Sequence, residues 1–492
     1  MNILHVYPEF PATFWSFKHA LSFVGKRAGS PPLGLITVAA LLPQEWQQRL
    51  VDANVTSLTE EDLRWADFVF LSAMTVQRDA AREIISRCKA AGVKVVAGGP
   101  LFTAEYREFA DVDHLVLNEA ELTLSPFLAD LERGNARRVY ATDQFPDIQQ
   151  TPIPRWELLD MRRYATMSVQ FSRGCPFHCD FCNVTAILGH KVRTKSAEQI
   201  IAELDSLYAL GWRDGIFFVD DNFIGNKRQL KGEILPALIE WRKGKTGFAF
   251  NTEASINLAD DQELMQMMVK AGFNSVFVGI ETPNQESLTE CGKKQNKNRD
   301  LLENVRHINR TGLQVQGGFI VGFDSDTPSV FQQQIDFIQQ SGIVTAMVGL
   351  LQAPHGTRLY ERLQREGRLL PHISGNNVDG STNIVPRMNV ETLREGYKRI
   401  LQYIYLPEHY YARVRTLLKD YPSPTIKTRV GMGDIRAFLR SVFHLGMKGK
   451  ERVHYWRLLF WTLFHRPKLF PLAITLAVYG FHFRRVCEVA AG

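Results

Sequence analysis

Short apolar runs alternate with amphipathic segments through the first 145 residues. Runs rich in Val, Ile, Leu and Phe lie at positions 3–8, 49–55, 67–74, 93–100 and 114–121. Between them apolar residues recur at helical spacing, as in AAREIISRCKAAG. Strands and helices in this order form βαβ units with a parallel sheet, which binds ligands beyond the carboxyl ends of its strands. Residues 1–145 are thus predicted to form a Rossmann-like domain, although GxGxxG is absent.

A second series of apolar runs follows a proline-containing segment. We assign a linker to residues 146–160 because its prolines disfavour regular structure. Six further strands are expected, which indicates an incomplete (β/α)6 barrel over 161–372 rather than an eightfold barrel. These strands are placed at 168–174, 215–223, 248–256, 275–282, 315–324 and 345–354. Residues 373–492 then show helix-like spacing and are predicted to form a helical C-terminal domain.

Composition narrows the class of protein. The 492 residues are 45% hydrophobic and 22% charged, which is typical of globular domains and excludes a disordered or collagen-like chain. Six cysteines are too few for a disulfide framework, so a reducing compartment is indicated. Because the N-terminus lacks the features of a signal peptide, we expect a cytoplasmic protein.

Positive charge gathers near the C-terminus. Residues 440–492 contain nine Lys or Arg and two Glu. Their apolar stretch at 469–483 has 15 residues and contains Pro471, which is short of the ~20 residues that span a bilayer. The basic residues flank apolar stretches rather than a groove, which argues against nucleic acid. The tail is interpreted as an interfacial element on an anionic membrane or, alternatively, as a helical cap packed on the main domain.

Three cysteines lie close together directly after the first predicted barrel strand. Cys175, Cys179 and Cys182 form a CxxxCxxC motif. Three thiolates can each bind one iron of a [4Fe-4S] cube and leave the fourth iron open. Structural zinc with His178 as fourth ligand, or cysteines without a shared role, are the alternatives.

This motif on a six-strand β/α barrel resembles the radical S-adenosylmethionine (SAM) enzymes. The resemblance implies that SAM binds the open iron and is cleaved by one electron to a 5′-deoxyadenosyl radical, which removes hydrogen from the substrate. It also implies that Phe181 lies against adenine. By the same resemblance, the remaining SAM contacts would come from strand-end residues, namely Asp220, Asp221 and Asn222 for the amino group and Glu253, Ser255 and Glu281 for the ribose and carboxylate.

The domain order resembles the cobalamin-binding radical SAM class. The features that carry the resemblance are PPLGL at 31–35 and the turn at Gly98 and Gly99, which would let the backbone approach the cobalamin tail. The DxHxxG pattern that supplies a histidine to cobalt is absent, so no lower ligand is assigned. The loop at 72–77, with Ser72 and Met74, would face the lower side of the corrin.

Nearly the whole sequence resembles those members that carry a helical C-terminal domain of unassigned function, including hopanoid C-methylases. The C-methyltransferases that act on bacteriochlorophyll side chains have a similar architecture. The matching segments are FWSFKHAL, VDDNFIGN, GIETP and GRLL.

This resemblance implies a radical C-methyltransferase that uses methylcobalamin on an unactivated carbon of a hopanoid-type lipid or a tetrapyrrole. It also implies an electron donor such as flavodoxin or ferredoxin. A non-methylating enzyme like the anaerobic cyclase, or a cobalamin or redox sensor, are the competing interpretations. No side chain is singled out as completing the reaction.

Overall fold

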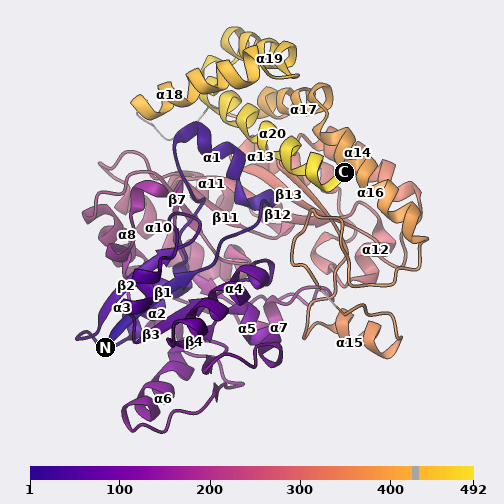
Figure 1. The fold of residues 1–492 in the computed structure, drawn as a ribbon. Helices are drawn as coiled ribbons and strands as arrows, with labels where there is room; N and C mark the ends of the chain where they lie inside the picture. The colour runs from indigo at the N-terminus through magenta and orange to yellow at the C-terminus, as the bar shows by residue number, and fades with distance from the viewer. Residues whose placement is uncertain (372, 424–430, 492) are drawn as a thin grey trace.

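The computed structural model describes residues 1–371, 373–423 and 431–491 (Figure 1). Its N-terminal part is a parallel six-stranded sheet in the order β2-β1-β3-β4-β5-β6. Alternate side chains of one strand enter opposite cores: Phe68 and Phe70 pack with α2 and α6, and Val69 and Leu71 with α3, α4 and α5. The elements are β1 (Asn2–Tyr7), α2 (Leu33–Leu41), β2 (Gln47–Asp52), α3 (Glu60–Trp65), β3 (Phe68–Ser72), α4 (Arg78–Ala90), β4 (Lys94–Gly98), α5 (Pro100–Glu105), β5 (His114–Val116), α6 (Ala120–Glu132) and β6 (Val139–Tyr140).

The five predicted strands are present, with one correction. The strand expected at 114–121 ends at Val116, because α6 begins at Ala120. The two-residue strand β6 was not predicted.

The central part is a second parallel sheet, in the order β14-β13-β12-β11-β10-β7. Strands β7 and β14 are its two edges, which confirms the partial barrel. Helices cover its outer face, and α8 among them begins with a capping box formed by Ser196 and Gln199. The elements are β7 (Thr166–Val169), α8 (Ala197–Ala209), β10 (Gly215–Phe218), α9 (Lys227–Gln229), α10 (Leu235–Trp241), β11 (Phe250–Glu253), α11 (Gln262–Ala271), β12 (Phe273–Glu281), α12 (Gln285–Glu290), α13 (Leu301–Thr311), β13 (Gln314–Val321), α14 (Ser329–Ser341) and β14 (Ala346–Leu350).

A small hairpin joins the two parts. Strands β8 (Ser172–Arg173) and β9 (Arg193–Thr194) pair antiparallel, and the cysteine loop and α7 (Val184–Leu188) lie between them.

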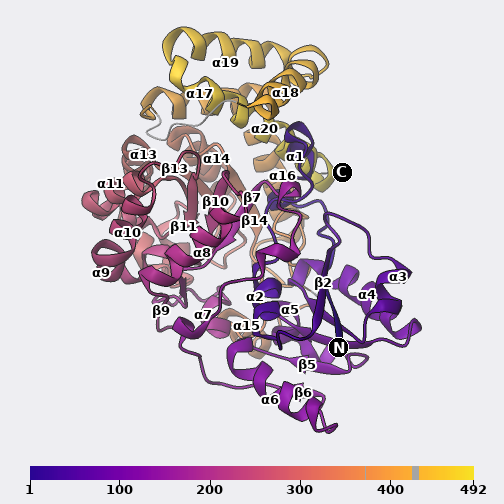
Figure 2. The same cartoon turned by 90° about the vertical axis from the view of Figure 1, so that its left-hand side faces the viewer.

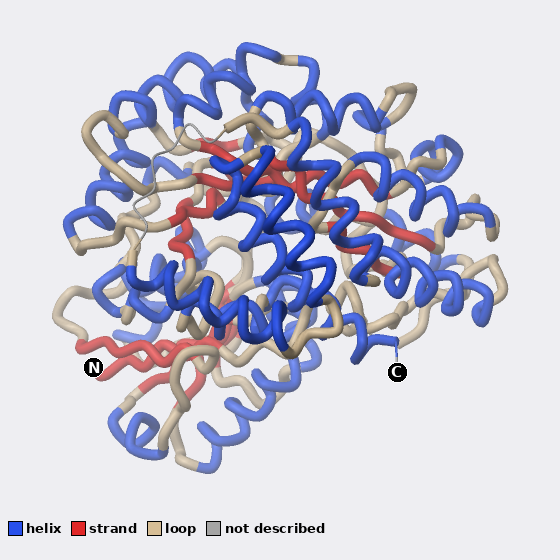
Figure 3. The backbone as a smooth tube through the Cα atoms, turned by 90° about the horizontal axis from the view of Figure 1, so that it is seen from above, coloured by secondary structure: helices blue, strands red, loops and turns tan. Residues whose placement is uncertain are grey.

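The C-terminal part consists of helices that pack on the barrel and on α1 (Lys18–Val24). Seen from above, they cover the barrel strands (Figure 3). The helices are α15 (Arg358–Arg365), α16 (Val390–Tyr405), α17 (Pro407–Asp420), α18 (Met432–Ser441), α19 (Arg452–His465) and α20 (Phe470–Ala491). A π-helical turn, Val442–Met447, extends α18.

The apolar stretch at 469–483 lies in the protein core. Leu469, Leu476 and Phe483 are fully buried, and Phe483 stacks on Phe14 with ring centroids 4.2 Å apart. Residues 469–483 therefore pack as a helical cap, as the second interpretation expects for this part of the tail. No helix in the described residues has the length and apolarity to cross a bilayer.

Candidate active site

The cysteine loop follows β8, and the chain then returns through α7 to β9, which pairs with β8. Cys175, Cys179 and Cys182 are each half-buried free thiols. The loop begins at Gly174, whose φ is +93°, and a Cβ added there would lie 2.6 Å from the carbonyl oxygen of Lys191. Only glycine fits this start without displacing the loop.

The three thiols lie close enough to influence one another. Burial, with the neighbouring Cys179, raises the pKa of Cys182 to about 12. Among the described residues, no three His, Cys, Asp or Glu converge as ligands of one metal ion would. The thiolates of a [4Fe-4S] cube each bind a different iron and need not converge, and iron binding deprotonates a thiol. The donor set therefore fits the cube.

Asp220 is tied to the backbone that leads into this loop. Its buried carboxylate accepts hydrogen bonds from the amide of Phe171 (3.1 Å) and from the amide and hydroxyl of Ser172 (2.6 Å for the hydroxyl). Burial raises its pKa to about 7. The available oxygens of Asp220 are used by the protein, which makes it a positioning residue.

Asn222 and Ser255 meet at the carboxyl ends of neighbouring strands. The Asn222 Oδ1 atom accepts from both the amide and the hydroxyl of Ser255 at 3.2 Å. The Ser255 hydroxyl also lies 2.6 Å from Asn257 Oδ1. The structure thus brings two of the expected SAM residues together.

Asp221 and Glu253 lie at the same edge and, like Asp220, have no ion-pair partner among the described residues. Burial and the repulsion of Asp221 and Asp220 raise the pKa of Glu253 to about 8. The side chain of Asp221 is exposed to solvent. The protein atoms around its carboxylate nevertheless remove part of its hydration and raise its pKa to about 6. Two such acids side by side favour a bound cation, because a cation removes their repulsion.

Glu281 has a partner that the sequence did not reveal. Its carboxylate accepts from Lys293 Nζ at 2.6 Å, and both side chains are nearly buried. The ammonium lies 5.9 Å from the centre of the Phe181 ring and faces Cys179 and Cys182. Gln295 donates to Cys179 Sγ at 3.6 Å. Segment 292–296 thus covers the cysteine loop.

No signal in the sequence sets Lys293 apart, because it is one of several lysines in a polar loop. Lys293 comes close to the cysteines because it pairs with Glu281, the last residue of β12.

A cavity of about 320 Å³ opens where the two sheets meet. Ser72, Gly98 and Gly99 line it from the carboxyl ends of β3 and β4. Arg173, Ile187, Leu188, Lys195 and Val219 line it from the barrel side. Met74 is 44% exposed and lies outside this lining.

The cavity wall is held by ion pairs between the two parts. Glu119 accepts from Arg173 at 2.6 Å and from Arg193 at 2.7 Å, and Glu121 pairs with Arg173 at 2.9 Å. All four side chains are nearly buried. Because Arg173 also lies two residues before Cys175, this junction connects the cavity with the cysteine loop.

Three family profiles match the chain. They are the B12 binding domain over residues 27–128, the radical SAM superfamily over 169–338 and a domain of unknown function, DUF4070, over 357–492. An uncharacterized methyltransferase of Synechocystis sp. is 42% identical over 99% of this chain and 92% of its own. The hopanoid C-2 methylase of Rhodopseudomonas palustris is 34% identical over 93% of this chain and 88% of its own.

The chain belongs to the cobalamin-binding radical SAM methyltransferases. Its cofactors are a [4Fe-4S] cluster, SAM and cobalamin.

Solved structures of this class share the fold. TsrM from Kitasatospora setae, with cobalamin and a [4Fe-4S] cluster bound, has a TM-score of 0.61 at 16% identity, over 93% of this chain and 98% of its own. OxsB, with aqua-cobalamin and SAM bound, has a TM-score of 0.62 at 15% identity, over 100% of this chain and 84% of its own. These likenesses confirm the fold class.

The fold requires glycine at positions 98 and 99 even without a bound cofactor. A Cβ on Gly98 would lie 2.6 Å from the carbonyl oxygen of Val116, and one on Gly99 would lie 2.4 Å from Ser72 Oγ. Gly99 also has a φ of +86°. The fold itself thus demands glycine at both positions, and the same absence of side chains leaves the cavity open to cobalamin.

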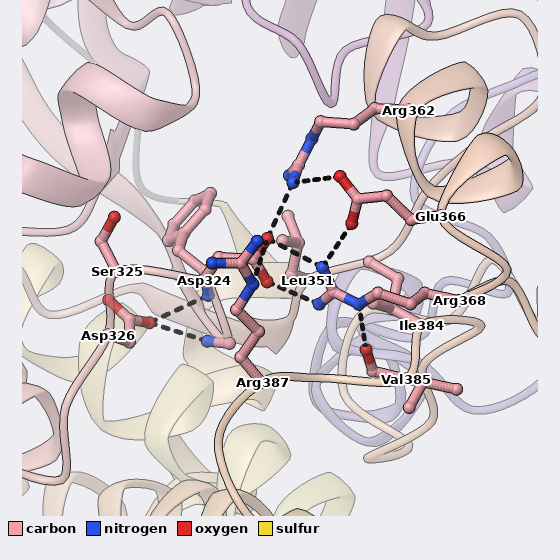
Figure 4. Close-up of polar contacts among 12 residues, drawn as sticks. Asp324, Ser325, Asp326, Leu351, Arg362, Glu366, Arg368, Ile384, Val385 and Arg387 are labelled. Carbon is pink, nitrogen blue, oxygen red and sulfur yellow. Dashed lines mark hydrogen bonds and ion pairs between the residues drawn. The ribbon is translucent and has the colours of Figure 1, made fainter.

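Two acids follow β13, Asp324 and Asp326. Asp324 lies between Arg362, Arg368 and Arg387 (Figure 4). Burial would raise its pKa, but hydrogen bonds from Arg368 and Arg362 lower it to about 2. Asp326 accepts from the amides of Gly322 and Phe323. In this methyltransferase Asp324 fastens the C-terminal region to the barrel, and Asp326 holds the turn after β13.

Proposed function

We propose that the protein is a radical C-methyltransferase that methylates an unactivated carbon of a hydrophobic substrate, of the hopanoid or isoprenoid lipid class or of the tetrapyrrole class. The observation that carries this proposal is the shared cavity. Residues at the carboxyl ends of the N-terminal strands and residues beside the cysteine loop line the same space. A methyl donor and a radical source can therefore serve one substrate.

The bound cluster and SAM supply a radical that removes a hydrogen atom, and cobalamin supplies a methyl group. The protein's own residues bind and orient these groups. Cys175, Cys179 and Cys182 would hold the cluster. Asp220 fixes the backbone that leads into their loop.

The polar residues at the strand ends would hold SAM. Asp221 and Glu253 offer anionic oxygens to its amino group or sulfonium, and the Asn222–Ser255 pair offers neutral hydrogen bonds. Glu281 is neutralised by Lys293, so this pair presents a cation and an anion together near Phe181. Such a pair suits the ribose hydroxyls and the carboxylate of SAM.

Ser72, Gly98 and Gly99 would contact cobalamin from the N-terminal side of the cavity. Met74 would reach the corrin from the adjacent loop. None of these residues supplies an imidazole to cobalt, in keeping with the absent DxHxxG motif.

A lipid substrate is favoured over a tetrapyrrole because the similarity to a lipid methylase extends over more of this chain. The similarity to the hopanoid C-2 methylase spans 93% of this chain. The bacteriochlorophyllide d C-12(1)-methyltransferase of Chlorobaculum tepidum is 26% identical over 69% of it. The similarity to the hopanoid methylase thus covers more of this chain.

We further propose that a low-potential carrier such as flavodoxin or ferredoxin reduces the cluster. A family that uses a radical from SAM needs a reductant. We place the enzyme at the cytoplasmic face of the membrane, where thiols stay reduced and a lipid can be collected from the bilayer.

An anaerobic assay tests this function. The protein is reconstituted with iron, sulfide and cobalamin, given SAM and a strong reductant, and supplied with or without a hopanoid-containing lipid extract. We expect 5′-deoxyadenosine and S-adenosylhomocysteine to rise together with the extract, and a lipid product heavier by one CH₂.

The controls separate the alternatives. Cys179→Ala removes a cluster ligand and should abolish both products. Deoxyadenosine without S-adenosylhomocysteine would favour a non-methylating radical enzyme, and a pigment extract that replaces the lipid extract would identify a tetrapyrrole substrate. Neither product from a cluster-loaded protein would favour a sensor.

A further inference from the structure

An apolar stripe runs along the outer side of α18 and its π-helical extension. Met432, Ile435 and Leu439 recur at the spacing of one helix face, and Phe443 and Met447 continue it. All five are exposed, Met432 by 69%. Scattered exposed apolar residues are ordinary, but a continuous stripe on one face is not.

Helix α19 carries a second stripe. Its exposed apolar side chains are Val453, Phe460, Leu463 and Phe464, and Phe464 is 78% exposed. Phe460 stacks on Trp456 with ring centroids 5.7 Å apart. Figures 1 and 2 both place α18 and α19 at one end of the molecule, away from the N-terminal sheet. We call these nine residues the outer apolar surface.

These helices use other faces to pack on the protein. Leu445, Tyr455, Leu458 and Leu459 are buried in the main core. Ser441 and Tyr455 share a buried hydrogen bond of 2.8 Å that joins the two helices. The outer apolar surface is thus additional to the apolar side chains that the fold needs.

The segment that carries this surface is rich in basic residues. Residues 431–468 contain eight Lys or Arg against two Asp or Glu. Of the two acids, Glu451 is buried and paired with Arg484, which leaves Asp434 exposed. Lys448 lies 4.4 Å from the centre of the Phe443 ring. Positive charge therefore borders the aromatic side chains directly.

From this arrangement we infer that the outer apolar surface seats on an anionic lipid bilayer, with apolar side chains below the headgroups and Lys and Arg among them. Aromatic and aliphatic residues ringed by cations are typical of helices that lie in a membrane interface. A second copy of the protein fits less well, because a symmetric contact would oppose two surfaces of the same positive charge.

This inference deepens the proposed membrane contact of the C-terminal tail and assigns it to particular side chains. The apolar stretch at 469–483 is core, and the contact residues lie on α18, the π-helical turn and α19. The inference rests on the proposed function in one respect: the membrane contact would serve to collect a lipid substrate. Vesicle binding needs no turnover, so the two can fail separately.

The test uses the full-length protein, loaded anaerobically with its cofactors, and vesicles of phosphatidylcholine with or without phosphatidylglycerol. Co-sedimentation is expected with the anionic vesicles and should weaken with salt. Phe460→Glu with Phe464→Glu should lower the partition coefficient at least tenfold. Lys448→Gln with Lys450→Gln should lower it about 25-fold, since each cation near an anionic surface contributes about fivefold.

Leu210→Glu is the matched control, because Leu210 is also exposed but lies on the barrel at the end of α8. It should bind vesicles like the parent protein. Equal thermal stability of all variants shows that they fold. Equal binding of the Phe variant and the control would overturn the inference, as would binding that ignores phosphatidylglycerol. A dimer that Phe464→Glu dissociates, without vesicle binding, would overturn it in favour of self-association.

Discussion

The junction between the two sheets offers the sharpest energetic prediction. Glu119 is 6% exposed and holds Arg173 and Arg193. In Glu119→Ala, Arg173 retains its ion pair with Glu121 at 2.9 Å. Arg193 retains only neutral acceptors, the carbonyl oxygens of Pro146 and Leu188. One desolvated cation therefore loses its anion, which costs about 3–5 kcal/mol. At about 2–4 °C per kcal/mol, the apparent unfolding midpoint should fall on the order of 10 °C.

Anaerobic thermal unfolding of the cofactor-loaded protein measures this fall, with the midpoint taken as apparent because a protein of several domains need not unfold in one step. Glu9→Ala is the control, since the Glu9–Lys18 pair is exposed on both sides and contributes at most about 1 kcal/mol. Arg193→Met added to Glu119→Ala should recover part of the loss by removing the unpaired charge. Equal shifts in Glu119→Ala and Glu9→Ala, or no recovery in the double variant, would refute the reasoning.

Four further predictions concern single side chains. Because the pKa of Glu253 is raised to about 8, SAM affinity should rise with pH through that value, and calorimetry should find this dependence lost in Glu253→Gln. Gly99→Ala should cost about 1–3 kcal/mol in thermal unfolding because of its positive φ and the contact with a neighbouring side chain, whereas Gly34→Ala, in open space on a helix, should be neutral or stabilising. Lys293→Met should lower the reduction potential of the cluster in an EPR-monitored titration, because a buried cation nearby favours the more negative reduced state. Because the pKa of Asp324 is lowered to about 2, its contribution to stability is present above the ordinary carboxyl pKa and is lost as pH falls towards 2; Asp324→Asn should unfold with a weaker acid dependence between those limits.

The features that the sequence predicted are those that local pattern encodes. Alternating apolar runs and helical segments specify both parallel sheets, because period and length distinguish strand from helix. The cysteine motif is local as well, since three ligands lie within eight positions. The strand-end residues Asn222 and Ser255 were placed correctly at one edge because parallel strands bring their carboxyl ends together.

Features that depend on contacts between distant residues were not predictable in the same way. Lys293 acquires its role only when segment 292–296 folds over the cysteine loop, and Arg173 acquires one only when Glu119, from the loop before α6, approaches. Asp220 looked like a SAM contact, but its oxygens are occupied by the backbone of Phe171 and Ser172. Residue type alone cannot distinguish an available carboxylate from one that the fold has already used.

The C-terminal helices show the same limit for apolar residues. The most apolar stretch of the tail, in α20, is buried, and the stripes that face solvent lie on α18 and α19, whose sequences mix apolar and charged residues. An amphipathic helix has one apolar face by pattern, but α19 has buried apolar side chains on one side and exposed ones on another, and α18 has the partly buried Phe438 beside its exposed stripe. The inner side chains pack in the core. The outer apolar side chains stay in contact with water unless a second partner covers them. If that partner is the bilayer that holds the substrate, the enzyme's lipid specificity begins at the far end of the molecule from the cofactors, and variants of the outer apolar surface should raise KM for vesicle-borne substrate while leaving SAM cleavage with a detergent-dispersed substrate unchanged.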